Sequence, residues 1–208
     1  MKIALAALLL ATPALAAPLE LNSDPAHSTA SFAVKHMMIN TVRGEFGKWN
    51  STVLWDKEDP SKSSVTVKID TASVNTNNEK RDGHLKSPDF FDAAKCPEIN
   101  FKSNKVEKAG SDDKYKVSGD LTMHCQTHPT TLDVTFTSNP MKAPWGAMVY
   151  AGSATGTLKR SEWGLVWNKP LEQAGGMLVS DEVTLQIDSE FMAKQAAPAA
   201  AETKAKKK

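Results

Sequence analysis

The sequence is poor in cysteine, in aromatic residues and in long apolar runs. Only two of its 208 residues are cysteine, and 7% are aromatic. The apolar run of residues 3–11 is too short to cross a bilayer as a helix, which takes roughly 20 such residues. The chain has no CxxC or CxxCH pair and no glycine-rich phosphate loop. It therefore gives no support to a helical membrane protein, a CxxC redox protein, a c-type haem protein or a nucleotide-binding enzyme.

The two ends of the chain differ in composition from the rest. Lys2, the apolar residues 3–11 and the small residues 14–16 match the three regions of a cleavable secretion signal. We therefore expect residues 1–16 to be a signal peptide and the chain to be exported. Residues 193–208 are rich in Ala and Lys and offer nothing for a core, so we expect a disordered Lys/Ala-rich tail.

The charge of the chain is nearly balanced. Without Lys2, Glu202 and the five lysines that follow Ala193, 19 basic and 23 acidic residues remain, a net charge of −4. Nucleic-acid affinity comes from many clustered cationic contacts. We therefore expect no nucleic-acid partner.

Apolar residues between Ser28 and Phe191 alternate with period two, which is typical of half-buried strands. The alternation predicts eight strands, over residues 31–36, 42–55, 65–69, 99–103, 115–123, 132–136, 147–160 and 183–191. Sequential strands hide their edges completely by closing into a barrel. We predict an all-β, eight-stranded antiparallel barrel, whose lumen is either filled by side chains or holds one small ligand.

Two local features interrupt this pattern. The alternation slips near Gly47 and Lys48, which predicts a bulge. Residues 75–101 form the one long connection, between predicted strands 3 and 4, and contain the one predicted helix, residues 79–86, capped by Asn77 or Asn78.

The long connection is highly charged, yet Leu85, Phe90 and Phe91 give it an apolar side. A segment with this composition suits a cover over the mouth of the barrel. Whether it opens as a lid or closes the barrel as a permanent plug remains open at this point.

Large apolar side chains share the inward phase of the predicted strands. They are Phe32, Phe46, Trp49, Phe101, Leu121, Phe136 and Leu185. Gly44, Ala154 and Gly156 on the same phase would leave space between them. Any one of the large residues could simply fill a core, but as a set beneath an apolar cover they favour a cavity.

Few residues suggest catalysis or metal binding. His124 and Cys125 precede His128 as metal-ligand types, but on a strand the first two would face opposite sides. The segment of residues 152–156 has glycines but no central serine and lies within a strand, so it is not a nucleophile elbow. We expect no metal, no cofactor, no catalytic residues and no enzyme activity.

The two cysteines could form a disulfide, which export would permit. A hairpin that turns at residues 109–113 brings Cys96 and Cys125 to its open end. Strand pairing that keeps Phe101 and Leu121 inside, however, places Pro97 opposite Cys125. Both outcomes remain open.

Several ordered motifs resemble one known family. Asp24-x-x-His27-Ser28, Arg81-Asp82-x-His84-Leu85-Lys86-Ser87-x-Asp89-Phe90-Phe91-Asp92 and Arg160-Ser161-Glu162-Trp163-Gly164 are similar to motifs of the YceI-like, polyisoprenoid-binding family. The resemblance runs over residues 19–190, and the second motif is its most specific part. Cys125 stands where the family usually has glycine, and Trp163 where phenylalanine is common.

The resemblance implies a periplasmic, lipocalin-like barrel over residues 17–192 that carries a long-chain amphiphile, such as a polyisoprenoid or an isoprenoid quinone. The polar residues His36, Arg81, Asp82 and His84 would hold its head group. The full set of expected ligand-binding residues is Phe32, His36, Phe46, Trp49, Arg81, Asp82, His84, Phe90, Phe91, Phe101, Leu121 and Phe136. Two alternatives remain, an enzyme acting on such a molecule and a filled barrel acting as an interaction module. A homodimer is also left open.

Overall fold

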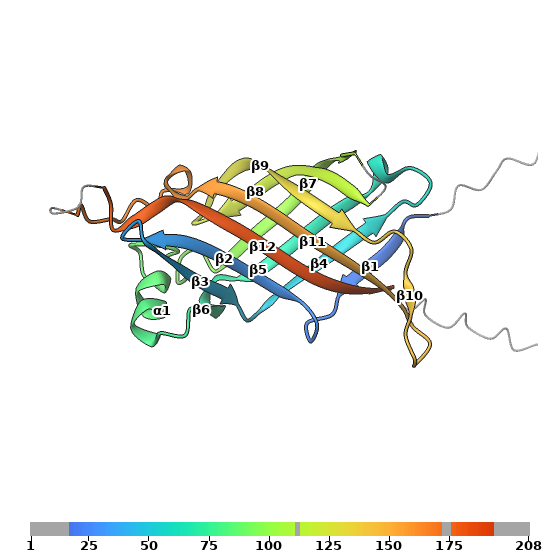
Figure 1. The fold of residues 1–208 in the computed structure, drawn as a ribbon, viewed down its shortest axis with the longest axis horizontal. Coiled ribbons are helices and arrows are strands. Elements are labelled where there is room, and N and C mark those ends of the chain that lie inside the picture. Colours follow the sequence, from blue (N-terminus) through green and yellow to red (C-terminus); the bar gives the residue numbers. More distant parts are fainter. Residues whose placement is uncertain (1–16, 111–112, 172–175, 194–208) are drawn as a thin grey trace, which may run out of the picture.

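The computed structural model describes residues 17–110, 113–171 and 176–193. The expected signal peptide and all but the first residue of the expected tail lie outside these residues. Figure 1 shows an elongated barrel of antiparallel strands with helix α1 at one end and strand β10 at the other. None of the described helices is long and apolar enough to span a membrane.

The strands are β1 (Leu19–Ser23), β2 (Thr29–His36), β3 (Asn40–Phe46), β4 (Trp49–Trp55), β5 (Ser64–Asp70), β6 (Val74–Asn75), β7 (Glu98–Lys108), β8 (Lys114–Met123), β9 (Gln126–Phe136), β10 (Met141–Lys142), β11 (Met148–Lys159) and β12 (Val179–Ala193). The helices are α1 (Glu79–Lys86) and the short 3-10 turns η1 (Pro60–Lys62), η2 (Thr71–Ser73) and η3 (Arg160–Trp163).

Eight strands close the barrel in the order β1, β4, β5, β7, β8, β9, β11 and β12. The ring closes because β12 pairs with β1 along one edge and with β11 along the other. The predicted eight-stranded antiparallel barrel is confirmed. Closure satisfies the backbone hydrogen bonds of both edges, which an open sheet would leave exposed.

Three neighbouring strands are interrupted part-way along the barrel. β1 continues as β2 after residues 24–28, β4 is the continuation of β3 after Gly47 and Lys48, and β5 continues as β6 after η2. The Gly47 amide donates to the carbonyl of Ser73 (3.0 Å), so two of these breaks are joined to each other. The sequence predicted a bulge at Gly47 and Lys48; the structure has a complete interruption of the strand at these two residues.

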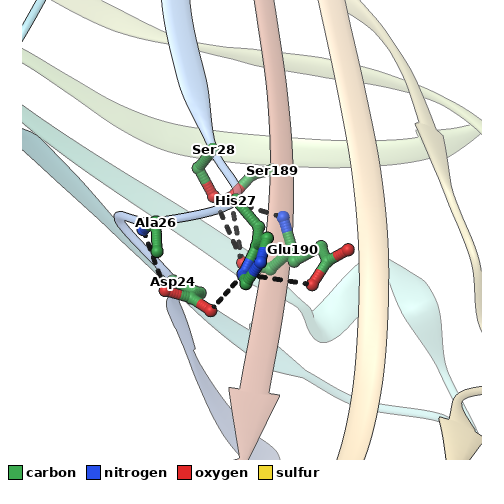
Figure 2. A network of polar contacts seen from close by, with 6 residues as sticks. All are labelled: Asp24, Ala26, His27, Ser28, Ser189 and Glu190. Carbon is green, nitrogen blue, oxygen red and sulfur yellow. Dashed lines mark hydrogen bonds and ion pairs between the residues drawn. The ribbon is translucent and has the colours of Figure 1, made fainter. Parts of the chain in front are cut away.

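The break between β1 and β2 is bound to β12, as Figure 2 shows. The Asp24 amide donates to the Glu190 carbonyl (2.8 Å), and the Ser28 and Ser189 hydroxyls lie 2.9 Å apart. Asp24 Oδ2 lies 2.8 Å from Nδ1 of His27, which also lies 3.8 Å from a Glu190 carboxylate oxygen. These contacts hold the break in place without a regular strand ladder.

The β10 end of the barrel is filled by aromatic side chains. The ring of Trp55 lies 4.8 Å from that of Phe136 and 5.8 Å from that of Tyr115, and Phe191 packs on Phe136 at 6.1 Å. All four are at least nine-tenths buried. Only about 80 Å³ of space remains among them and their neighbours. This half of the lumen is a packed core.

The turn between β8 and β9 differs from the expectation. Met123 pairs with Gln126, so His124 and Cys125 form a two-residue hairpin turn, with φ of +50° and +58°. The expectation that they alternate on a strand was wrong. Both central residues of such a turn adopt positive φ, a conformation that suits glycine, which agrees with the family resemblance at Cys125.

A disulfide joins Cys96 to Cys125, with their Cα atoms 5.4 Å apart. Pairing of Pro97 with Cys125 would have required strand pairing that continues to Cys125. The ladder between β7 and β8 instead begins at Asn100 and Thr122, and Cys125 lies in the turn beyond it. The bridge therefore connects the cover segment to the barrel wall.

Candidate functional site

The half of the barrel nearest α1 contains a cavity of about 700 Å³. Its wall is formed mainly by apolar side chains on the inward phase of β2, β3, β5, β7, β8 and β12. Phe32, Phe46, Phe101 and Leu121 are among them, as expected from the alternation. Ligand sites usually span about 300–1,000 Å³, and this volume lies within that range. The filled-barrel alternative therefore applies to the β10 half alone.

The cover of the cavity is built from α1 and the loop that follows it. The Asn78 side chain accepts from the Arg81 amide (3.0 Å) and caps the helix, which spans the residues predicted for it. The helix has no buried residues. Phe90 and Phe91, only 7% and 8% exposed, bury the apolar side of the loop instead, and the Phe91 ring lies 5.8 Å from that of Phe46.

The cover meets a second segment, the loop between η3 and β12. The Trp167 ring lies 4.8 Å from that of His84 and 5.4 Å from that of Phe90, and all three residues line the cavity. Sequence reasoning missed Trp167. The available signal was the apolar run Leu165-Val166-Trp167 in a connection between strands, because a large aromatic residue there needs a partner to cover it.

Polar side chains gather where α1 joins β6. Asp82 Oδ1 accepts from the amide and hydroxyl of Thr76 (2.9 and 2.5 Å), while Arg81 donates from Nε to the same hydroxyl (2.7 Å) and from Nη2 to the Thr76 carbonyl (2.8 Å). Arg81, His84 and His36 line the cavity. Asp82 is not among the lining residues, and its contacts are those of a group that holds the start of the cover.

Two further expected residues lie outside this cavity. Trp49 packs against the core at the break between β3 and β4. Phe136 lies in the packed β10 half. Both are on the inward phase, but the cavity occupies only part of the lumen, so the phase alone did not place them.

Arg160 is a lining residue that sequence reasoning did not select. It is the first residue of η3 and is 6% exposed. Its Nε donates to the Ser180 carbonyl (3.0 Å) and its Nη1 to the Leu165 carbonyl. Burial lowers the pKa of its guanidinium, an effect that the charge of Asp181 partly offsets.

One group of described residues has ligating atoms close enough for a metal ion. Atoms of Asp24, His27 and Glu190 lie within 4.8 Å of one another, at the break shown in Figure 2. The hydrogen bond from His27 lowers the pKa of Asp24 and raises that of His27. The two therefore form a charge-assisted pair that already accounts for their proximity.

His124 and Cys125, which are metal-ligand types, are bonded to protein groups instead. Nδ1 of His124 is hydrogen-bonded to the Trp163 carbonyl (2.9 Å), and the Cys125 sulfur is in the disulfide. This hydrogen bond holds η3 against the β8–β9 turn, and Trp163, 1% exposed, donates in addition to the Leu121 carbonyl (3.0 Å).

The barrel, its cover and its cavity correspond to a known domain type. A family model of the YceI-like domain matches residues 21–191. The chain belongs to the YceI-like family. A UPF0312 protein of Staphylococcus aureus (strain USA300) is 37% identical to it over 171 residues, which are 81% of this chain and 94% of that protein.

Solved structures of YceI-like and related proteins resemble this one. BcnA of Burkholderia cenocepacia has a TM-score of 0.66 at 26% identity, covering 81% of this chain and 98% of its own. A Campylobacter jejuni YCEI protein has the same score at 30% identity, covering 77% and 90%. A polyisoprenoid binding domain from Saccharophagus degradans shares the fold, with a TM-score of 0.55 at 15% identity, covering 85% and 99%.

Proposed function

We propose that this YceI-like protein is a periplasmic carrier that holds a long-chain isoprenoid-type amphiphile, a polyisoprenoid or an isoprenoid quinone, in its cavity. The main observation in support is the cavity of about 700 Å³, which has an apolar wall and a polar cluster at one end. An amphiphile matches this layout, since its tail would lie against the wall and its head group would lie near the cover.

The tail alone would provide enough affinity. Burial of one five-carbon prenyl unit contributes about 3–4 kcal/mol at ~0.8 kcal/mol per methylene. Association costs about 4–15 kcal/mol in lost freedom of motion. About three to eight prenyl units would therefore outweigh this cost and reach micromolar affinity.

An exposed apolar turn beside the cavity supports the same proposal. Met37, Met38 and Ile39 form the turn between β2 and β3 next to His36, and all three are exposed. The turn adjoins cavity residues His36 and Asn40. An apolar tail that enters at this end would pass apolar side chains before it reaches the wall.

Three further points support export and binding. Residues 1–16 have the composition of a secretion signal. The disulfide suits an oxidising compartment such as the periplasm. One structural relative, the Saccharophagus degradans domain, is described as polyisoprenoid-binding. Fractionation of cells that express the full chain tests the location, and recovery in the cytoplasm alone would contradict it.

Function without catalysis is part of the proposal. His84 is hydrogen-bonded to Asp89 (2.9 Å) and its ring packs edge-to-face on Phe90 and Trp167. These contacts are those of a residue that stabilises the cover. A carrier returns its ligand unchanged. Incubation with geranylgeraniol followed by mass spectrometry should therefore recover the alcohol intact, whereas a converted product that is absent from heat-denatured controls would favour the enzyme alternative.

Co-purification of lipid tests the carrier directly. The protein should be purified from the periplasm without detergent, extracted with organic solvent and examined by mass spectrometry, and the delipidated protein titrated with geranylgeraniol. We expect an isoprenoid-type molecule in the extract and saturable binding of about one molecule per chain. Absence of both would reject the carrier function.

A further inference from the structure

Arg160 is a buried cation in the wall of an apolar cavity. Its side chain is 6% exposed, and the residue lines the cavity together with its neighbours Leu165 and Trp167. A buried charge is costly unless it is paired and fully hydrogen-bonded. The position therefore requires a partner for the charge.

The described residues provide Arg160 with hydrogen-bond acceptors but with no ion-pair partner. Nε and Nη1 donate to the backbone carbonyls of Ser180 and Leu165. Among the described residues, no carboxylate lies within ion-pair distance of Arg160 and no acceptor is hydrogen-bonded to Nη2. Asp181 is the nearby acid, but its two oxygens accept from the amide and hydroxyl of Ser161 (3.0 and 2.7 Å).

We propose that Arg160 is the head-group site of the cavity and that it binds an anionic oxygen group, a phosphate or a carboxylate, at the end of the apolar chain. The inference rests on the proposed carrier function and deepens it. The N–H groups that the backbone does not use can donate to two oxygens of one anion, a geometry that guanidinium favours. The anion would supply the opposite charge that the guanidinium lacks among the described residues.

The surroundings of Arg160 fit a bound amphiphile. Leu165 and Trp167 of the loop after η3 line the same cavity, as do Val183 and Leu185 of β12. A head group at Arg160 would thus lie in a wall that is otherwise largely apolar, and its chain could extend along the apolar residues of β12. Arg81 stands apart, because its Nε and Nη2 are already bonded to Thr76.

Three probes with one chain test this: geranylgeranyl monophosphate, geranylgeranoic acid and geranylgeraniol, each titrated calorimetrically into delipidated protein. We expect the phosphate or the acid to bind about 10- to 100-fold more tightly than the alcohol, the range that corresponds to a charged hydrogen bond. The stronger of the two anions identifies the head group. Equal binding of all three would overturn the inference but leave the carrier intact, whereas no binding of any probe would reject the carrier itself.

Variants of Arg160 distinguish recognition of the anion from a purely structural role in holding the loop after η3. Arg160→Gln should reduce the anion-to-alcohol affinity ratio at least tenfold, with geranylgeraniol binding nearly unchanged. The control Arg43→Gln, at an exposed position of β3 that does not line the cavity, should keep the ratio. A role limited to bracing Leu165 and Ser180 would weaken all three probes alike and leave the ratio unchanged, which would overturn the proposal. If Arg160→Gln does not fold, Arg160→Lys replaces it; lysine keeps the charge but not the two-pronged donor geometry, so the anion-to-alcohol affinity ratio should fall. A ratio near one in the wild type would overturn the proposal.

Discussion

The ring of Trp167 stands 4.8 Å from that of His84, at an interplanar angle of 90°. This contact joins the loop after η3 to helix α1, two segments that are about 80 residues apart in the chain. Phe90 completes the cluster, 5.0 Å from His84. The cover of the cavity is therefore closed by aromatic contacts, in addition to the disulfide at Cys96.

We expect Trp167→Ala to speed the release of a bound ligand. The change removes two aromatic contacts worth about 0.5–1.5 kcal/mol each, which corresponds to a roughly 5- to 150-fold faster dissociation if both hold the cover closed. Stopped-flow displacement of a fluorescent lipid measures this rate. Trp145→Ala is the matched control, because Trp145 is 71% exposed on the loop between β10 and β11. A release rate equal to that of this control would show that the cover does not gate the cavity.

Filling the cavity should abolish binding without unfolding the barrel. Leu185 lines the cavity and Thr184, its neighbour on β12, is exposed on the outer face. Leu185→Trp should weaken geranylgeraniol binding at least tenfold, because the indole occupies space that the tail needs. Thr184→Trp should bind as the wild type does. Circular dichroism confirms folding in both, and normal binding by Leu185→Trp would place the ligand outside the cavity.

Loss of the disulfide should destabilise the protein by an amount that depends on the residue at position 125. The bridge spans 29 residues, for which loop-closure entropy gives about 3–4 kcal/mol. In urea unfolding we expect Cys96→Ser with Cys125→Ser to lose this amount. Cys96→Ser with Cys125→Gly should be about 1 kcal/mol more stable than the serine pair, since glycine adopts the φ of +58° without strain. Equal stability of the two double variants would contradict the turn geometry.

The pair of Asp24 and His27 should make stability depend on pH. Hydrogen bonding to Asp24, and the charges of Asp24 and Glu190, raise the pKa of His27 above 6.5, so its contribution is present below that value and is lost as the pH rises through the raised pKa. The hydrogen bond from His27 lowers the pKa of Asp24 below 3.8, so its contribution is lost only as the pH falls through that lowered pKa.

His27→Gln should therefore lower the melting temperature more at pH 5 than at pH 8. His27 is exposed and Asp24 is only partly buried, so the difference should be small and should shrink in high salt. Thermal melts of wild type and variant at the two pH values measure it. A larger loss at pH 8 would show that the pair does not act as a charged hydrogen bond.

Local patterns were sufficient for the architecture. Side chains alternate with period two along a strand regardless of distant partners, so Phe32, Phe101 and Leu121 could be placed on the inner face from the sequence. The helix could be placed because Asn78 is a capping residue that acts within one turn. The interruption at Gly47 and Lys48 could be read for the same reason, as a local change of phase.

Contacts between distant segments decided the rest. The lumen could be hollow or filled, and only the packing of Trp55, Tyr115 and Phe136, from three strands, closed one half and left the other open. The disulfide depended on a turn whose positive φ values cannot be seen in a period-two pattern. Arg160 faces the cavity because η3 folds against β12, so its burial and unmet charge follow from tertiary contacts. The sequence by itself determined a barrel with a cover, because periodicity and capping act over a few residues. The tertiary structure decided where that barrel is empty and which charge lies inside it, because those depend on residues far apart in the chain.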